Sequence, residues 1–228
     1  MLNLPFGVVL RVVLSILLLS TLTLGGVAQA KGPGKAVLPI AKARSAPIAS
    51  VVTVSGTVST PPGAFASSFF DLGFGLQDDT AGIFVSSQVL LGAHLGDKVR
   101  VTGVLQDSYG LLILVPASPA DVTVGEDGPP VLPEFVSTAG VGESTEGSIV
   151  QVVGTVSQAV SSDLPYGYKF AVDDGSGPIQ IFINTQTGID SSALTPGDTV
   201  SVTGFSSQFD THYEIDPRRP KDIKIRRR

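Results

Sequence analysis

The chain repeats one strand-rich pattern about a hundred residues apart. VRVTGVL at Val99–Leu105 returns as VSVTGFS at Val200–Ser206, and a Gly-Asp pair precedes both stretches. Two earlier blocks match in the same order, namely Val52–Ser59 with Val150–Ser157 and Leu76–Val85 with Val172–Ile181. Because both the order and the spacing of the blocks repeat, we interpret the chain as two copies of one folding unit.

Each copy has the pattern of short strands joined by turns. Val and Ile are prominent among the apolar residues, and no ten-residue helical pattern occurs beyond the first thirty residues. The turns DDTAG and DDGSG occupy equivalent places, where Asp bonds its own backbone and Gly accepts a positive φ. The pattern predicts an all-β fold, with a brief connection at Gln88–His94. The strands expected in the first copy are Val52–Ser59, Phe70–Gln77, Gly82–Ser86, Lys98–Leu105, Leu111–Val115 and Asp121–Val124.

Glycines inside the expected strands indicate small closed barrels. Gly56 and Gly103, matched by Gly154 and Gly204, fit the tight bends of barrel corners. The run GTV…LQDDTAGIFV…GDKVRVTG resembles oligonucleotide/oligosaccharide-binding (OB) modules of the tRNA-anticodon/helicase type. The second copy, VDDGSGPIQIFIN…GDTVSVTGF, resembles the OB-like modules attached to secreted bacterial nucleases. The resemblance covers nearly all of Val52–Ile225 and implies two tandem five-stranded Greek-key barrels.

The first thirty residues have the layout of a secretory signal peptide. A charge-free apolar run follows Arg11 and ends at Ala28-Gln29-Ala30, a small-x-small cleavage pattern. The alternative is an uncleaved membrane anchor, because Pro5–Leu24 is long enough to span a bilayer. Cleavage predicts a secreted, periplasmic or cell-envelope protein, and membrane contact is expected only if the segment is retained.

The chain therefore divides into five expected segments. They are a signal peptide (1–30), a flexible basic arm (31–48), an OB-like domain (49–125), a Pro-rich linker (126–147) and a second OB-like domain (148–228) with a basic C-terminal tail. The chain contains no Cys, so an exported fold would be held by its core rather than by disulfides.

The OB resemblance also implies where a ligand would bind. OB barrels use the face of strands 2 and 3 beside the loops that join strands 1–2 and 4–5. Each of these loops contains an aromatic residue, and such rings can stack on bases, worth about 1–3 kcal/mol per base. The alternative is that the rings pack on strand ends or between the barrels. The loops are expected at Thr60–Phe69, Gln158–Tyr168, Gln106–Gly110 and Ser207–His212, and their aromatics are Phe65, Phe69, Tyr166, Tyr168, Tyr109 and Phe209.

Charge is distributed unevenly along the chain. Between Ser45 and Pro217 there are 19 acidic residues and three basic ones, and an acidic surface repels phosphates. Basic residues gather at the ends: Lys31, Lys35, Lys42 and Arg44 in the expected arm, and Arg218, Arg219, Lys221, Lys224, Arg226, Arg227 and Arg228 in the tail. The tail can bind phosphate or anionic lipid, or be an ordinary solvated tail.

Signs of metal binding or catalysis are weak. The pairs Asp78-Asp79 and Asp173-Asp174 offer oxygen ligands for Ca²⁺, but their place in turns explains them equally well. His94 and His212 belong to no recognisable catalytic motif, and the absence of Cys removes a thiol nucleophile. We expect a non-enzymatic protein without a metal or cofactor.

Two functional hypotheses follow. The first is an exported nucleic-acid-binding protein with a preference for single strands, which uses loop aromatics and basic residues. The second is an envelope protein- or glycan-interaction module with no nucleic-acid role, favoured by the acidic body and the Ser/Thr/Gly-rich loops. The residues assigned to nucleic-acid binding are Tyr109, Phe209, Tyr166, Tyr168, Lys98, Arg100, Lys169, Arg218, Arg219, Lys221, Lys224, Arg226, Arg227 and Arg228.

Overall fold

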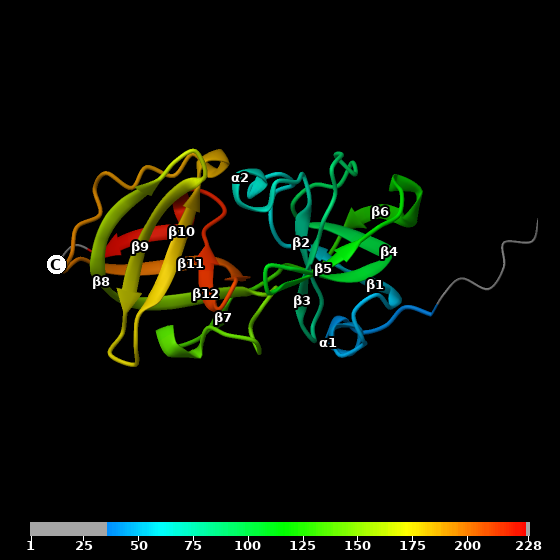
Figure 1. Ribbon diagram of the computed structural model, residues 1–228, viewed down its shortest axis with the longest axis horizontal. Helices are drawn as coiled ribbons and strands as arrows, with labels where there is room; N and C mark the ends of the chain where they lie inside the picture. The colour runs from blue at the N-terminus through cyan, green and yellow to red at the C-terminus, as the bar shows by residue number, and fades with distance from the viewer. Residues whose placement is uncertain (1–35, 227–228) are drawn as a thin grey trace, which may run out of the picture. The chain divides into compact units, whose positions relative to one another are not determined.

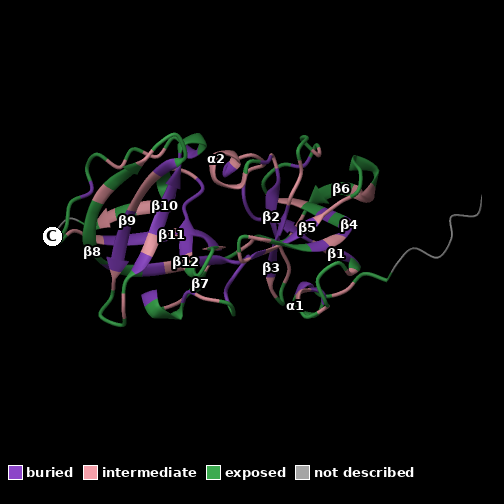
Figure 2. Cartoon of the chain, viewed as in Figure 1, coloured by how far each residue is buried: buried purple, intermediate pink, exposed green. Residues whose placement is uncertain are grey.

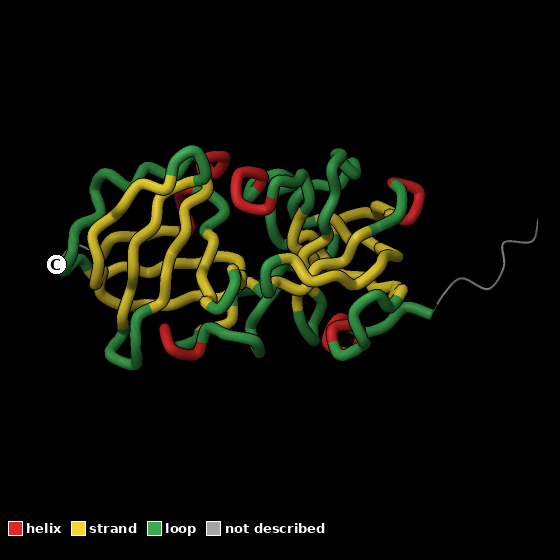
Figure 3. Tube along the Cα trace, in the orientation of Figure 1, coloured by secondary structure: helices red, strands yellow, loops and turns green. Residues whose placement is uncertain are grey.

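The structure, a computed structural model, describes residues 36–226 (Figure 1). The predicted signal peptide, the start of the predicted arm, Arg227 and Arg228 lie outside the described residues. Strands dominate, and the helices within this range are short (Figure 3). None of these helices has the length and apolar character needed to cross a bilayer. The helices are α1 (Ile40–Arg44), α2 (Ala66–Phe69), and the 3₁₀ turns η1 (Pro119–Asp121), η2 (Thr138–Gly140), η3 (Thr185–Thr187) and η4 (Pro220–Asp222).

Five strands of the first sheet close into a barrel. Along the sheet the order is β1-β2-β3-β5-β4-β6, and β4 also pairs with β1 from Val51↔Val104 to Thr57↔Lys98. The β3–β5 pair is parallel and the other pairs are antiparallel. This is the five-stranded barrel that the OB resemblance implies. The strands are β1 (Val51–Val58), β2 (Phe74–Gln77), β3 (Gly82–Val85), β4 (Asp97–Ser108), β5 (Leu111–Val115) and β6 (Val122–Asp127).

The second sheet pairs its strands in the corresponding order. The run β8-β9-β10-β12-β11 returns on itself because β11 also pairs with β8, and β10 and β12 are the parallel pair. Strands β7 and β13 extend the sheet at its ends. The strands are β7 (Glu134–Phe135), β8 (Ile149–Asp163), β9 (Gly167–Asp173), β10 (Ile179–Asn184), β11 (Thr199–Phe209), β12 (His212–Asp216) and β13 (Ile223–Arg226).

Alternation along the strands builds a core inside each sheet (Figure 2). On β10, Ile179, Ile181 and Ile183 face the core of the second sheet, so that Gln180 and Phe182 face outward. The predicted bends occur at the mid-strand glycines. A Cβ on Gly56 would lie 2.6 Å from the Gln77 carbonyl oxygen, and one on Gly154 would lie 2.7 Å from that of Asp173, so only glycine allows these close approaches.

The first half of the expected strand Phe70–Gln77 is not extended. Helix α2 precedes it, Phe70 adopts a left-handed conformation with φ 56°, and β2 begins only at Phe74. The reason is tertiary, because the ring of Phe69 packs edge-on against Phe84 at 4.6 Å. Other boundaries also move, because longer strands shorten the second-copy loops to 164–166 and 210–211.

The segments before the two sheets are packed, in contrast to the expected arm and linker. In the described part of the arm, α1 buries Ile40 in the core of the first sheet. The Ile40 N–H donates to Asp78 Oδ2 at 2.8 Å, and the Thr138 N–H donates to the equivalent Asp174 Oδ2 at 3.1 Å. The predicted turn aspartates thus anchor both segments. Both segments therefore supply apolar and backbone contacts to the sheets that follow them.

A third apolar cluster lies between the two sheets. Phe205 of β11 contacts Phe65 and Phe84 of the first copy, with ring centroids 5.8 and 5.9 Å apart. Gly82 and Gly147 cross so closely that a methyl group on either would collide with the backbone of the other. The outward face of β2 and β3, where the OB resemblance places a ligand of the first copy, is therefore covered by the second copy.

Candidate ligand-binding site

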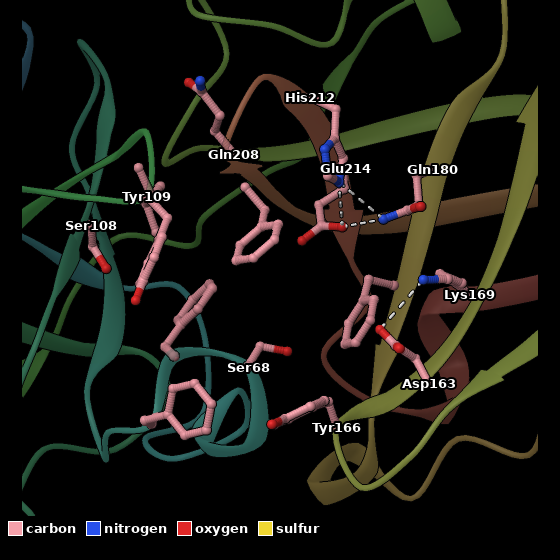
Figure 4. Close-up of a pocket in the computed structure, with 15 residues that line it drawn as sticks. Ser68, Ser108, Tyr109, Asp163, Tyr166, Lys169, Gln180, Gln208, His212 and Glu214 are labelled. Atoms are coloured by element: carbon pink, nitrogen blue, oxygen red, sulfur yellow. Dashed lines mark hydrogen bonds and ion pairs between the residues drawn. The ribbon is translucent and has the colours of Figure 1, made fainter.

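The four loops expected beside separate OB grooves meet at a single cleft (Figure 4). The cleft has a volume of about 430 Å³, within the range of small-molecule sites. On one side stand α2 and the β4–β5 turn, and on the other stand the outward faces of β9, β10 and β12. Six aromatic side chains line the cleft: Phe69, Phe70, Tyr109, Tyr166, Phe182 and Phe209.

Helix α2 is held at one edge of the cleft by hydrogen bonds to the second copy. The Ser67 hydroxyl donates to the Tyr166 carbonyl at 2.7 Å, and the Ser68 hydroxyl donates to Asn184 Oδ1 at 2.6 Å. The left-handed backbone at Phe70 turns its ring toward Tyr166, with centroids 5.6 Å apart. These contacts fix two rings at this edge.

Two equivalent hairpin turns form the opposite edge. The Asp210 N–H donates to the Tyr109 carbonyl at 2.6 Å, and the Tyr109 and Phe209 rings lie 5.7 Å apart at 32°. Tyr109 and Phe209 are 66% and 47% exposed, which leaves ring surface free for a ligand. Neither ring is buried in a hydrophobic core.

The polar part of the cleft centres on Glu214, which is almost fully buried on β12. Gln180 Nε2 donates to Glu214 Oε2 at 2.6 Å, and His212 Nε2 lies 4.0 Å from the same oxygen. Burial raises the pKa of the Glu214 carboxyl, while Gln180, His212 and Lys169 act in the opposite direction. The cleft therefore presents a carboxyl group that can hold a proton more readily than an exposed one.

Charge in the cleft does not favour a polyanion. The lining contains two carboxylates, Asp163 and Glu214, and one lysine, Lys169. Lys169 Nζ lies 3.5 Å from Asp163 Oδ2, so its charge is already offset. Among the described residues assigned to nucleic-acid binding, Tyr109, Tyr166, Lys169 and Phe209 line the cleft and the rest do not.

Strand alternation explains why Tyr168 does not line the cleft. Tyr168 and Lys169 are neighbours on β9 and face opposite sides, so Tyr168 packs on the core of the second sheet. Lys98 and Arg100 are exposed on β4, away from the lining of the cleft.

Arg218 is a structural residue rather than a free cation. Its side chain is buried, its Nε and one terminal nitrogen donate to the two oxygens of Asp222, and Nη1 donates to the Ser59 carbonyl at 2.9 Å. Arg219 also lies 3.5 Å from Asp222. Lys221, Lys224 and Arg226 are exposed but do not line the cleft. The described part of the predicted basic tail thus belongs to the fold around η4 and β13.

Phe70 and Phe182 are cleft residues that the sequence assignment missed. The position of Phe182 could have been predicted from the sequence. Ile179, Ile181 and Ile183 alternate along β10 and face the core, so Phe182, between Ile181 and Ile183, must face outward. Phe70 was hidden because it was assigned to a strand. Within residues 36–226, no group of three or more His, Asp or Glu side chains is placed to hold a metal ion.

Comparison with known proteins gives matches to solved structures. No family model matches the chain, and no curated protein matches it. The Stn1–Ten1 complex of S. pombe is 22% identical over 35% of this chain and 59% of that chain, with a TM-score of 0.31. A replication protein A heterotrimer bound to ssDNA is 19% identical over 35% and 58%, with a TM-score of 0.29. An OB domain from Methanosarcina mazei is 12% identical over 42% and 84%, with a TM-score of 0.34. The chain thus spans less than two thirds of the first two structures.

Proposed function

We propose that this protein is an exported, non-enzymatic binding protein whose cleft holds a neutral or cationic oligosaccharide. The observation that carries the proposal is the composition of the cleft, in which six aromatic side chains accompany two carboxylates and a single lysine. This composition favours the second hypothesis from the sequence, in its glycan form.

The chemistry of the lining suits sugar rings. The apolar faces of sugars pack against aromatic faces such as Tyr109 and Phe209, which are exposed and offer large rigid surfaces. Sugar hydroxyls can donate to Asp163 and Glu214 and can bond to the Gln180 amide, because carboxylates accept and amides do both. None of these contacts requires a charge on the ligand.

In this proposal the two sheets are tandem OB modules that contribute different parts of one binding site. The second module supplies the strand 2–3 face through β9 and β10, the face with which OB barrels bind oligosaccharides or oligonucleotides. The first module supplies the flanking loops, namely α2 with Phe70 and the turn at Tyr109. Its own strand 2–3 face packs against the second copy, which makes one site from two modules.

Single-stranded nucleic acid is the second candidate, and one observation favours it. The exposed rings of Tyr109 and Phe209 form a neighbouring pair that bases could stack on. Against it stand the acidic cleft and the burial of Arg218, because phosphate binding depends on free cations.

Calorimetric titration of the purified protein distinguishes the candidates. The probes are chitohexaose, maltohexaose, cellohexaose and xylohexaose as neutral hexamers, a cationic glucosamine hexamer, and dT12 at low salt. We expect saturable binding of a neutral or cationic hexamer, weakened by Phe209→Ala, an exposed ring of the cleft, and unchanged by Phe135→Ala, an exposed ring outside the cleft. Binding of dT12 with a steep salt dependence, and of no sugar, would replace this proposal with the nucleic-acid one.

Export rests on the N-terminal sequence pattern alone. We propose cleavage after Ala30, which gives a mature chain that begins at Lys31. N-terminal sequencing of protein recovered from outside the cytoplasm tests this, and a mature chain that still begins at Met1 would support the membrane-anchor alternative.

A further inference from the structure

The cleft continues into a second hollow on the same face of the second sheet. This hollow has a volume of about 380 Å³ and shares Lys169, Gln180 and His212 with the cleft. Its remaining lining comes from β8, β9, β10 and the residues beside them, including Ser161, Ala171 and Pro178. Cleft and hollow therefore form one groove along the outward side of β9 and β10.

The groove is closed where it meets the first copy. Phe69 and Leu111 both line the cleft. Leu111 belongs to the buried apolar cluster between the sheets, and Phe69 packs against this cluster. The Phe70–Tyr166 ring contact stands at one edge of this end, and the Tyr109–Phe209 contact stands at the other. A chain that enters along β9 and β10 has no continuation through this wall.

We propose that the protein captures the end of a glycan chain rather than a stretch of its interior. The terminal ring lies among the aromatics of the cleft, and the chain leaves over Gln180 and His212 into the second hollow. This inference rests on the proposed function, since it concerns how the same groove holds the same class of ligand.

The polar groups in the groove fit this direction. A chain end carries a free hydroxyl where an interior unit carries a glycosidic bond, and a buried acceptor selects strongly for a donor that satisfies it. Glu214 is such an acceptor: one carboxylate oxygen bonds to Gln180, and the other points toward the aromatic side chains in Figure 4. Gln180 and His212 line both compartments and stand where the second unit would lie.

Stoichiometry on chains of increasing length tests the inference. The probes are the four neutral sugars and the cationic glucosamine sugar named above, each as chains of six, twelve and twenty-four units, titrated into the purified protein. End capture predicts a constant number of bound proteins per chain at every length. A number that rises in proportion to length would overturn end capture and leave the proposed function intact, whereas no binding by any of the sugars would remove both.

A pair of variants on β8 tests the direction of the chain. Ser161 lines the second hollow, whereas its neighbour Ser162 does not. Ser161→Trp should lower the affinity for the hexamer at least tenfold and leave the affinity for the dimer of the same sugar unchanged. Ser162→Trp, with the same bulk on the same exposed strand, should change neither. Equal loss for dimer and hexamer in Ser161→Trp, or no loss for either, would contradict an exit over the second hollow.

Discussion

The backbone N–H of Asp210 donates a 2.6 Å hydrogen bond to the carbonyl oxygen of Tyr109, and the two residues hold equivalent places in the two copies. Both have a left-handed backbone with φ 53°. The hairpin turn at Tyr109 thus contacts the corresponding turn at Asp210, and this contact holds the Tyr109 and Phe209 rings 5.7 Å apart. These two hairpin turns therefore build one edge of the cleft.

Tyr109→Gly should separate binding from stability. Glycine adopts positive φ without the cost of about 1–2 kcal/mol that an L side chain carries, so the free energy of unfolding should not fall. The lost ring should lower affinity for the hexamer that binds by roughly tenfold, since an aromatic contact contributes about 0.5–1.5 kcal/mol beyond its buried area. Urea unfolding and calorimetric titration measure the two effects. Asp210→Gly is the matched control, which should keep affinity, and a Tyr109→Gly protein with undiminished affinity would exclude this edge from the site.

Arg44→Ala should destabilise the protein strongly, although Arg44 does not line the cleft. Arg44 lies 2.9 Å from Glu146 Oε1, and both side chains are largely buried. Loss of one partner from a buried ion pair leaves an uncompensated charge, which costs about 3–5 kcal/mol. Lys42→Ala, at an exposed position on the same helix, should change the free energy of unfolding by less than about 0.5 kcal/mol. Adding Glu146→Gln to Arg44→Ala should restore part of the loss, and equal effects of the two alanine variants would refute the pairing.

Arg218→Ala should affect folding rather than ligand capture. The side chain links Asp222 to the Ser59 carbonyl of the first copy. Its removal leaves the buried Ser59 carbonyl without this donor and takes the buried guanidinium away from Asp222, which keeps the backbone N–H of residue 218 and the ion pair with Arg219. We expect a loss of about 3–5 kcal/mol in the free energy of unfolding. Lys224→Ala, an exposed member of the same cluster, should be nearly neutral. If Arg218→Ala kept native stability but bound dT12 less well than the wild type, the structural role would be wrong and Arg218 would be a nucleic-acid-binding residue.

Asp216 should make stability depend on pH. It is fully buried on β12, close to the Glu214 carboxyl and the Ser207 hydroxyl. Burial, reinforced by the neighbouring Glu214, raises the pKa of Asp216 well above its usual value, while the Ser207 hydroxyl acts more weakly in the opposite direction. The unfolded chain releases this proton near pH 4, but the folded chain keeps it to higher pH. The free energy of unfolding should therefore fall as the pH rises between the two pKa values, by up to about 1.4 kcal/mol per pH unit.

Asp216→Asn removes this titration. The variant should gain stability relative to the wild type as the pH rises from 4 toward the folded pKa of Asp216, measured by urea unfolding. Asp190→Asn is the control, because hydrogen bonds from Ser192 lower the pKa of that exposed carboxyl. Its effect on stability has the opposite sign and is confined to pH values below the usual Asp pKa, so no change is expected from pH 4 upward. Parallel pH profiles for the wild type and Asp216→Asn would show that Asp216 is charged in the folded state.

The sequence determined the strands because their signals are local. Alternation of Val and Ile and the Asp/Gly turns predict β5 at its observed bounds and β1 within one residue. The repeat predicts that both copies share one order of strands, and mid-strand glycines such as Gly56 predict the bends. Helix α2 escaped prediction because Phe65 and Phe69 pack on Phe84 and Phe205, residues brought there by other parts of the chain.

The sequence by itself determined the all-β class, the strand positions and the set of loops that carry aromatic residues. Only the tertiary structure decided that these loops share one cleft, that Lys169 faces it while Tyr168 does not, and that Arg218 is a buried ion-pair partner. The physical reason is that strand and turn preferences act within a few residues. Which outward faces of the two sheets pack together depends instead on apolar and charged contacts between residues more than a hundred positions apart. Examples are Phe84 with Phe205 and Arg218 with Ser59.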